Sequence, residues 1–158
     1  MTSPLVAVEL TADERDFIEQ TLEQWTLSAS GKPFPYQVLG LWSWDEFGDL
    51  VIRLSDAVMA GEALTDLDWA RVLFLTEIAW ASSLVGAGLD FVAMTRFSDV
   101  QGLGLLRGLQ RKIGGVHRAK LLFPNGGRTE TPEELAERQR WADEVLREQQ
   151  TRQYPPGL

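Results

Sequence analysis

Residues 65–85 read TDLDWARVLFLTEIAWASSLV, and this stretch decides the fold. Thr65 has the hydroxyl of a helix N-cap, two aspartates follow in the first turn, and Gly86 stands directly after Val85. Apolar side chains occupy most of the circumference of this helix, which at about 1.5 Å per residue is about 30 Å long. A helix that is apolar on most sides is surrounded by other elements. We therefore expect a helical fold packed around a central apolar helix at about 66–85.

Four further helix starts have an equally clear signal. A serine or threonine is followed three residues later by glutamate or glutamine, the pattern of a capping box, at Thr11, Ser43, Ser98 and Thr131. We expect the corresponding helices at about 12–28, 44–60, 98–113 and 131–150. With the central helix, they predict an all-α, single five-helix domain over residues 1–150, followed by a flexible C-terminal tail at 151–158.

Two features leave more than one local structure open. Residues 5–10 favour a short edge strand, and residues 116–123 fit either a short strand or one helical turn, so a short peripheral β-hairpin is an option. Three glycines (Gly102, Gly104 and Gly108) fall inside the predicted fourth helix, where each costs up to about 1 kcal/mol relative to alanine. They indicate either close packing against a neighbour or a loosely held helix.

The charges are segregated along the chain. Residues 1–106 hold 16 acidic and 5 basic residues, a net charge of −11, whereas residues 107–158 hold 7 acidic and 10 basic residues, a net charge of +3. The whole chain carries −8, which opposes long-range attraction to nucleic acid. Such a separation of charge influences which partners a protein attracts more than it influences the fold. We expect the acidic N-terminal two-thirds to attract a basic partner.

Composition excludes several kinds of site. The chain has no cysteine and one histidine, so disulfides, cysteine nucleophiles, thiolate metal sites and multi-histidine zinc sites are ruled out. No nucleophile elbow, Walker A loop or dinucleotide-binding fingerprint is present. We therefore expect no catalytic residue, no metal and no cofactor. Because the lack of cysteine suits a reducing compartment and no apolar run is long enough for a membrane span, we expect a cytoplasmic protein.

Glu77 is the most anomalous residue, because it falls on the apolar side of the central helix. A carboxylate in that position needs an ion pair, a hydrogen bond or a proton. One interpretation is a ligand-binding or acid–base carboxylate between helices. The interpretation we favour is a structural contact, with Arg96, Arg107 or Arg111 as the partner.

A basic segment at residues 107–120 contains no acidic residue. Its cations are Arg107, Arg111, Lys112, Arg118 and Lys120. Arg107 and Arg111 are four residues apart and share a helix face, a spacing that can follow nucleic-acid phosphates. The alternative is pairing with the chain's own acids, or with the acidic face of a second copy in a homodimer.

Trp42 and Trp44 flank the start of a helix, after a loop that contains two prolines. Tryptophan is enriched among the residues that dominate protein interfaces. Together with Asp45 and Asp49, they are the candidate partner-binding residues of the acidic part. The alternative for both tryptophans is packing into the core.

Three functions from different classes follow from these features. We place first a non-catalytic protein-binding module whose acidic surface docks a partner protein, for example an inhibitor or immunity-type protein for a basic target. The second is a nucleic-acid-linked regulator that uses residues 107–120. The third is a small-molecule binder or small enzyme that uses Glu77 in an interhelical pocket.

Overall fold

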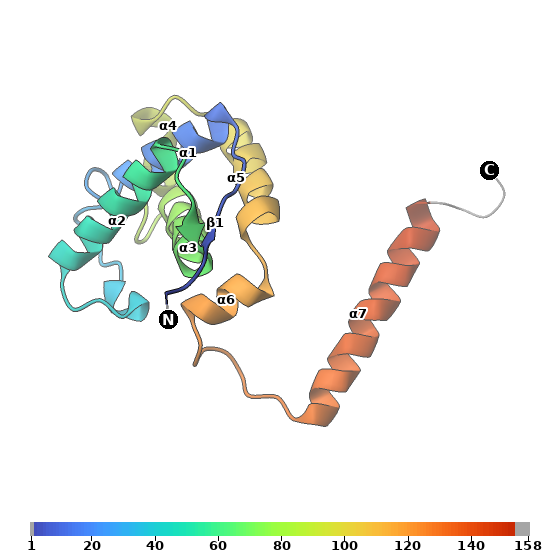
Figure 1. The fold of residues 1–158 in the computed structure, drawn as a ribbon. Helices are drawn as coiled ribbons and strands as arrows, with labels where there is room; N and C mark the ends of the chain where they lie inside the picture. The colour runs from blue at the N-terminus through green and yellow to red at the C-terminus, as the bar shows by residue number, and fades with distance from the viewer. Residues whose placement is uncertain (1, 154–158) are drawn as a thin grey trace. The chain divides into compact units, whose positions relative to one another are not determined.

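A computed structural model describes residues 2–153 of the chain, and its elements divide between two compact units, residues 1–125 and 126–158 (Figure 1). The elements of the first unit are β1 (Leu5–Val6), α1 (Ala12–Glu23), η1 (Tyr36–Leu39), α2 (Trp44–Met59), β2 (Leu64–Thr65), α3 (Asp66–Ala81), η2 (Gly88–Asp90), α4 (Phe91–Met94), α5 (Asp99–Ile113) and α6 (Val116–Leu122). The second unit contains α7 (Pro132–Gln153).

The prediction of a mostly helical fold with a small β element is confirmed, but the predicted number of five helices is wrong. Residues 2–153 form seven α-helices. The two additional ones are short: α4 has four residues and α6 has seven. Gly115, with a φ of 113°, turns the chain between α5 and α6, so residues 116–122 are helical and not a strand. Short helices of this kind depend on packing more than on sequence periodicity.

The small sheet joins two segments that lie far apart in the sequence. β1 pairs antiparallel with β2, with Leu5 opposite Thr65 and Val6 opposite Leu64. The indole Nε1 of Trp69 donates a hydrogen bond of 2.8 Å to the Val6 carbonyl. The predicted strand at 5–10 is therefore present over two residues, and its partner is the segment that leads into α3.

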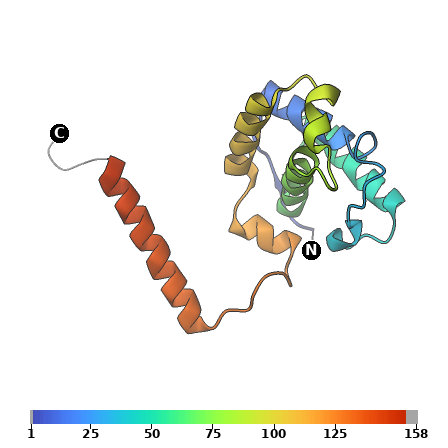
Figure 2. The ribbon, with the colours of Figure 1, turned by 180° about the vertical axis from the view of Figure 1, so that it is seen from behind.

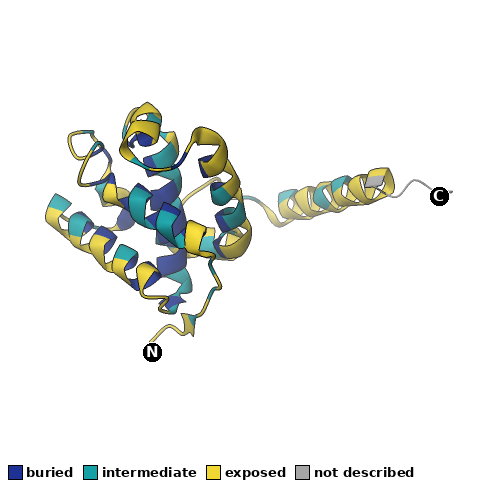
Figure 3. Ribbon diagram, turned by 90° about the horizontal axis from the view of Figure 1, so that it is seen from above, coloured by how far each residue is buried: buried dark blue, intermediate teal, exposed yellow. Residues whose placement is uncertain are grey.

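α3 is the helix around which the first unit packs. It contacts α1, α2, α5 and α6, and both views of the ribbon place it among them (Figures 1 and 2). Trp69, Val72, Leu75 and Ala79 of α3 are buried. Buried residues gather on the inward faces of the helices of this unit (Figure 3). Burial of these apolar surfaces is the main favourable term in folding.

All five predicted helix starts are confirmed, whereas two predicted helix ends are wrong. α1 ends at Glu23 and not at residue 28, because the backbone N–H groups of Gln24, Trp25 and Thr26 donate to carbonyls three residues back and the chain continues in turns. α3 ends at Ala81 and not at residue 85. The Ser82 hydroxyl accepts from the N–H of Val85, and the N–H of Ala87 donates to the Ala79 carbonyl at 2.7 Å. This loop therefore folds back onto the end of α3.

In the second unit, Thr131 caps α7 by accepting a hydrogen bond from the N–H of Glu134 at 3.2 Å. The helix exposes Leu135, Trp141 and Leu146. Residues 151–153 of the predicted tail continue α7, and its remaining residues, 154–158, lie outside the described part of the chain. The predicted domain boundary at residue 150 stays a prediction. No helix within residues 2–153 has the length and apolar character needed to cross a membrane.

Candidate partner-binding surface

Most carboxylates of residues 1–106 have no cationic partner. Among the described residues, ion pairs reach five of the 16 acids in this part, namely Asp13, Glu14, Asp16, Asp66 and Asp68. The other eleven acids have no ion pair within residues 2–153. The negative charge of residues 1–106 is therefore mostly not neutralised by ion pairs within the described structure.

The five cations of the same part are all occupied by the fold. Arg53 and Arg71 both pair with Asp68, and Arg96 pairs with two aspartates on α1. Arg15 donates to the Leu10 carbonyl, and Lys32 donates to two carbonyls of the loop after α3. None of these side chains is left to neutralise the eleven remaining acids.

The paired carboxylates are held in their ionised form. Burial disfavours the charge of Glu14, but the hydrogen bonds from Lys112 and Thr11 outweigh it and lower the pKa of the carboxyl. Burial likewise disfavours the charge of Asp68, and its two arginine partners outweigh it and lower the pKa of that carboxyl. These pairs connect helices to one another, so we assign them a structural role.

The solvent side of α2 contains a continuous acidic face. Asp45, Asp49, Ile52, Asp56 and Met59 are all exposed. Their spacing of four, three, four and three residues places them on one side of the helix, over a length of about 21 Å. We call these five residues the α2 face. It contains both aspartates predicted to bind a partner, and none of its three carboxylates has an ion pair among the described residues.

The two candidate tryptophans have different environments. Trp42 is 90% exposed, yet its backbone N–H donates a hydrogen bond of 2.7 Å to the Glu46 carboxylate, which fixes the chain at the start of α2. Trp44 packs its ring against Phe47, at 5.0 Å between centroids, and against Tyr36, at 6.1 Å. Trp42 therefore exposes its ring three residues before Asp45 in the chain, whereas Trp44 extends the aromatic core.

A groove runs between α1 and α2. It has a volume of about 230 Å³ and is lined by Glu19, Leu22, Glu23, Thr26, Val51, Ile52, Ser55 and Asp56. Leu22 and Val51 are buried and form its apolar floor, while Ile52 remains 55% exposed. The sequence prediction did not include this groove. The four-residue spacing of Glu19 and Glu23 indicates that both acids lie on one helix face. Only the packing of α1 on α2 brings these acids near Asp56.

Glu77 does not contact any of the arginines proposed for it. Its carboxylate accepts a hydrogen bond of 2.8 Å from the side-chain amide of Gln110 on α5. The carbonyl oxygen of that amide accepts from Arg107 at 2.7 Å, so Arg107 acts on Glu77 only through Gln110. Arg96 instead pairs with α1. The hydrogen bond that this carboxylate requires therefore comes from Gln110, on a helix that packs against α3.

The structure divides the basic segment 107–120. Lys112 pairs with Glu14, and Arg118 pairs with Asp66 at 3.0 Å. Arg107, Arg111 and Lys120 are exposed and have no ion pair among the described residues. Internal pairing therefore accounts for two of the five predicted cations.

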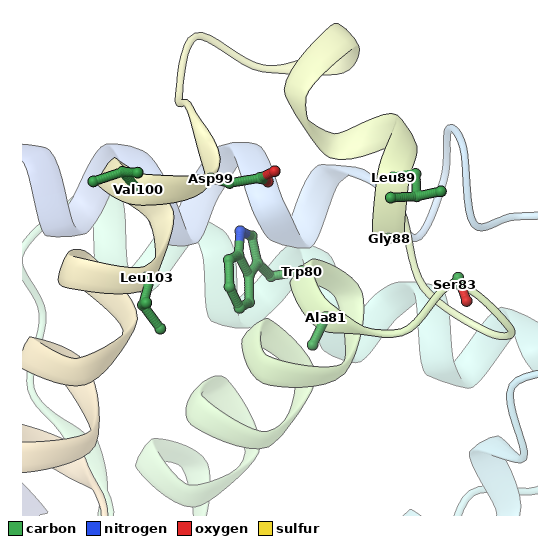
Figure 4. Close-up of a pocket in the computed structure, with 8 residues that line it drawn as sticks. All are labelled: Trp80, Ala81, Ser83, Gly88, Leu89, Asp99, Val100 and Leu103. Carbon is green, nitrogen blue, oxygen red and sulfur yellow. The ribbon is translucent and has the colours of Figure 1, made fainter.

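An apolar cleft of about 520 Å³ lies at the end of α3, where η2 and α5 meet (Figure 4). Figure 4 shows Trp80 between Val100 and Leu103 of α5 and Leu89 of η2. Leu89 is 89% exposed and Val100 is 83% exposed. The polar side chains that line the cleft are those of Ser83 and Asp99, and Trp80 contributes its indole ring. This lining favours apolar contact.

Comparison with known proteins gives no functional information: no protein-family model, curated protein or solved structure matches the chain. The functional proposal therefore depends on the residues described above.

Proposed function

We propose that this chain is a non-catalytic protein-binding module whose α2 face docks a basic partner protein. The observation that supports this most directly is the charge balance of residues 1–106, where five cations serve the fold and eleven acids have no ion pair among the described residues. Complementary charge accelerates association and selects among partners.

Asp45 lies in the first turn of α2, where an acid favours the helix, but folding gives no comparable reason for Asp49 and Asp56. Asp45 and Asp49 are four residues apart on one helix, an arrangement of like charges that destabilises a helix by about 0.2–0.5 kcal/mol. The cations of a basic partner would attract both aspartates and offset the repulsion between them. Trp42 precedes α2 on a backbone held by Glu46 and exposes a large apolar ring, the kind of residue that dominates interface energies.

The other two predicted functions have less support. Two of the five cations of the basic segment pair with the chain's own acids, which reduces its capacity for phosphates. Glu77 is hydrogen-bonded to Gln110, as a structural carboxylate would be.

Capture of the tagged full-length chain from its native cells, followed by mass spectrometry, tests the proposal. We expect a protein partner that survives nuclease treatment and is lost as salt rises. The double variant Asp45→Lys/Asp49→Lys should lose this partner. Its matched control, Glu9→Lys/Asp90→Lys, makes the same change in net charge at exposed acids outside the α2 face and should retain it. Equal retention by both double variants, or no retained protein at all, would overturn the proposal.

A further inference from the structure

We infer that the groove between α1 and α2 binds a basic amphipathic helix of the partner protein. This inference rests on the proposed function and specifies the partner element. It combines an apolar floor with acidic residues on both sides of the groove. These features belong to one site. Seven of the eight lining residues come from α1 and α2, which pack against each other, and the eighth, Thr26, follows shortly after α1.

The floor of the groove explains the apolar side of the partner helix. Leu22 and Val51 close the bottom, and Ile52 stands beside them with more than half of its side chain exposed. Ile52 is exposed on α2, as is Met59, whereas Phe47, Leu50 and Leu54 of the same helix are buried. An isoleucine that shows this much surface next to a groove provides apolar area for a partner to cover.

The walls of the groove explain the basic flanks of the partner helix. Glu19 and Glu23 lie one turn apart on α1, and Asp56 lies on α2. None of the three has an ion pair within residues 2–153. Asp49 lies outside the lining of the groove, about two helical turns before Asp56 on α2. Lysine or arginine on either side of an apolar stripe would meet a carboxylate on each wall.

The dimensions favour a helix as the occupant. Along α1 the groove extends from Glu19 to Glu23, about 6 Å or one helical turn, and Thr26 follows in the turn after the helix. A helix laid along two others places its side chains in such a groove, with apolar anchors three or four residues apart. Two anchors on successive turns of the partner would therefore reach the floor, and the flanking positions would point to the acids.

Fluorescence anisotropy with two synthetic peptides tests the inference on the full chain. One peptide of about 18 residues has leucines along one helix face and lysines elsewhere. The other has the same composition, with the leucines spread around the helix. We expect the amphipathic peptide to bind at least about tenfold more tightly than the permuted one, because charge alone does not distinguish them. Equal binding of the two peptides would overturn the inference, and this comparison needs no protein variant.

Three variants then place the peptide in the groove. Ile52→Gln keeps every charge and should remove the preference for the amphipathic peptide. Glu19→Lys/Glu23→Lys should weaken both peptides by about tenfold or more, while the control Glu9→Lys/Asp90→Lys should change them by less than about threefold. Circular dichroism verifies that each variant is folded. Unchanged binding by Ile52→Gln, or equal losses in the two charge variants, would overturn the inference.

Two outcomes separate this inference from the proposed function. If the native partner depends on Asp45 and Asp49 but the peptide preference is absent, the protein-binding function stands and the groove is not its helix site. If sedimentation shows a dimer that Glu19→Lys/Glu23→Lys dissociates, the groove is occupied by a second copy, and the inference of a foreign basic helix is overturned.

Discussion

Two glycines of α5, two residues apart, should respond in opposite ways to the same substitution. A Cβ at Gly102 would lie 2.6 Å from Nε1 and 3.2 Å from Cε2 of the Trp80 ring, whereas a Cβ at Gly104 would have no neighbour within 4 Å. Trp80 is held by α3 and packs against Phe91, at 6.4 Å between ring centroids. The ring therefore has to move for Gly102→Ala, and no group has to move for Gly104→Ala.

The magnitudes follow from two separate effects. Alanine is favoured over glycine in a helix interior by about 1 kcal/mol, and both variants gain this amount. Overpacking at position 102 costs about 1–3 kcal/mol. The difference between the two variants therefore isolates the steric effect: Gly104→Ala should exceed Gly102→Ala in unfolding free energy by about 1–3 kcal/mol.

Urea unfolding of the two variants and the wild type measures this difference. Circular dichroism reports the helices, and tryptophan fluorescence reports the displacement of Trp80 in the Gly102→Ala variant. We expect the midpoints to follow the order Gly104→Ala, wild type, Gly102→Ala, with unchanged slopes. If Gly102→Ala were as stable as Gly104→Ala, the requirement for glycine at the Trp80 contact would be refuted.

Three further predictions concern the first unit. Lys112→Met should lower the unfolding free energy by about 1–2 kcal/mol at pH 7, because the buried Glu14 carboxylate loses its charged donor. The folded-state pKa of Glu14 is lowered, so the stabilisation exists above its unfolded pKa and is lost as pH falls through the folded value. The difference between Lys112→Met and wild type in urea should therefore shrink as the pH is lowered through the folded-state pKa of Glu14, and a constant difference would contradict this assignment. Trp42→Ala should change stability by less than about 0.5 kcal/mol and Trp25→Ala should cost about 3–5 kcal/mol, because the first ring is exposed and the second is buried; similar losses in thermal unfolding would contradict the placement of Trp42. A chain of residues 1–125 should unfold cooperatively on its own, because the core cluster lies entirely within it; a gradual, non-cooperative transition would contradict the division into units.

Helix starts were predictable because their signals are local. The threonine and serine caps at Thr11, Ser43, Thr65, Ser98 and Thr131 each bond to a backbone N–H three residues away, so the interaction is complete within one turn. The apolar circumference of residues 66–81 likewise predicted a helix with neighbours on several sides. The helix ends after α1 and α3 were not predictable in this way. They depend on which carbonyls the backbone N–H groups after α1 and in the loop after α3 reach.

The candidate surface was predictable only in part. The excess of acids over bases in residues 1–106, and Asp45 and Asp49 within it, could be read from the sequence. Asp56 and Ile52 follow the same helical spacing and could have been added from the pattern alone. The groove with Glu19 and Glu23 could not, because it exists only where α1 packs on α2.

The sequence by itself determined the helical class, the positions where the helices start, and the sign of the charge on each part of the chain, because these properties arise from composition and from contacts within one turn. Only the tertiary structure decided which acids were neutralised, which glycine of α5 is required, and which tryptophan is exposed. Glu14 meets Lys112 across 98 residues, and Gly102 meets Trp80 between two helices. Such contacts depend on the packing of whole helices, which no local pattern of residues specifies.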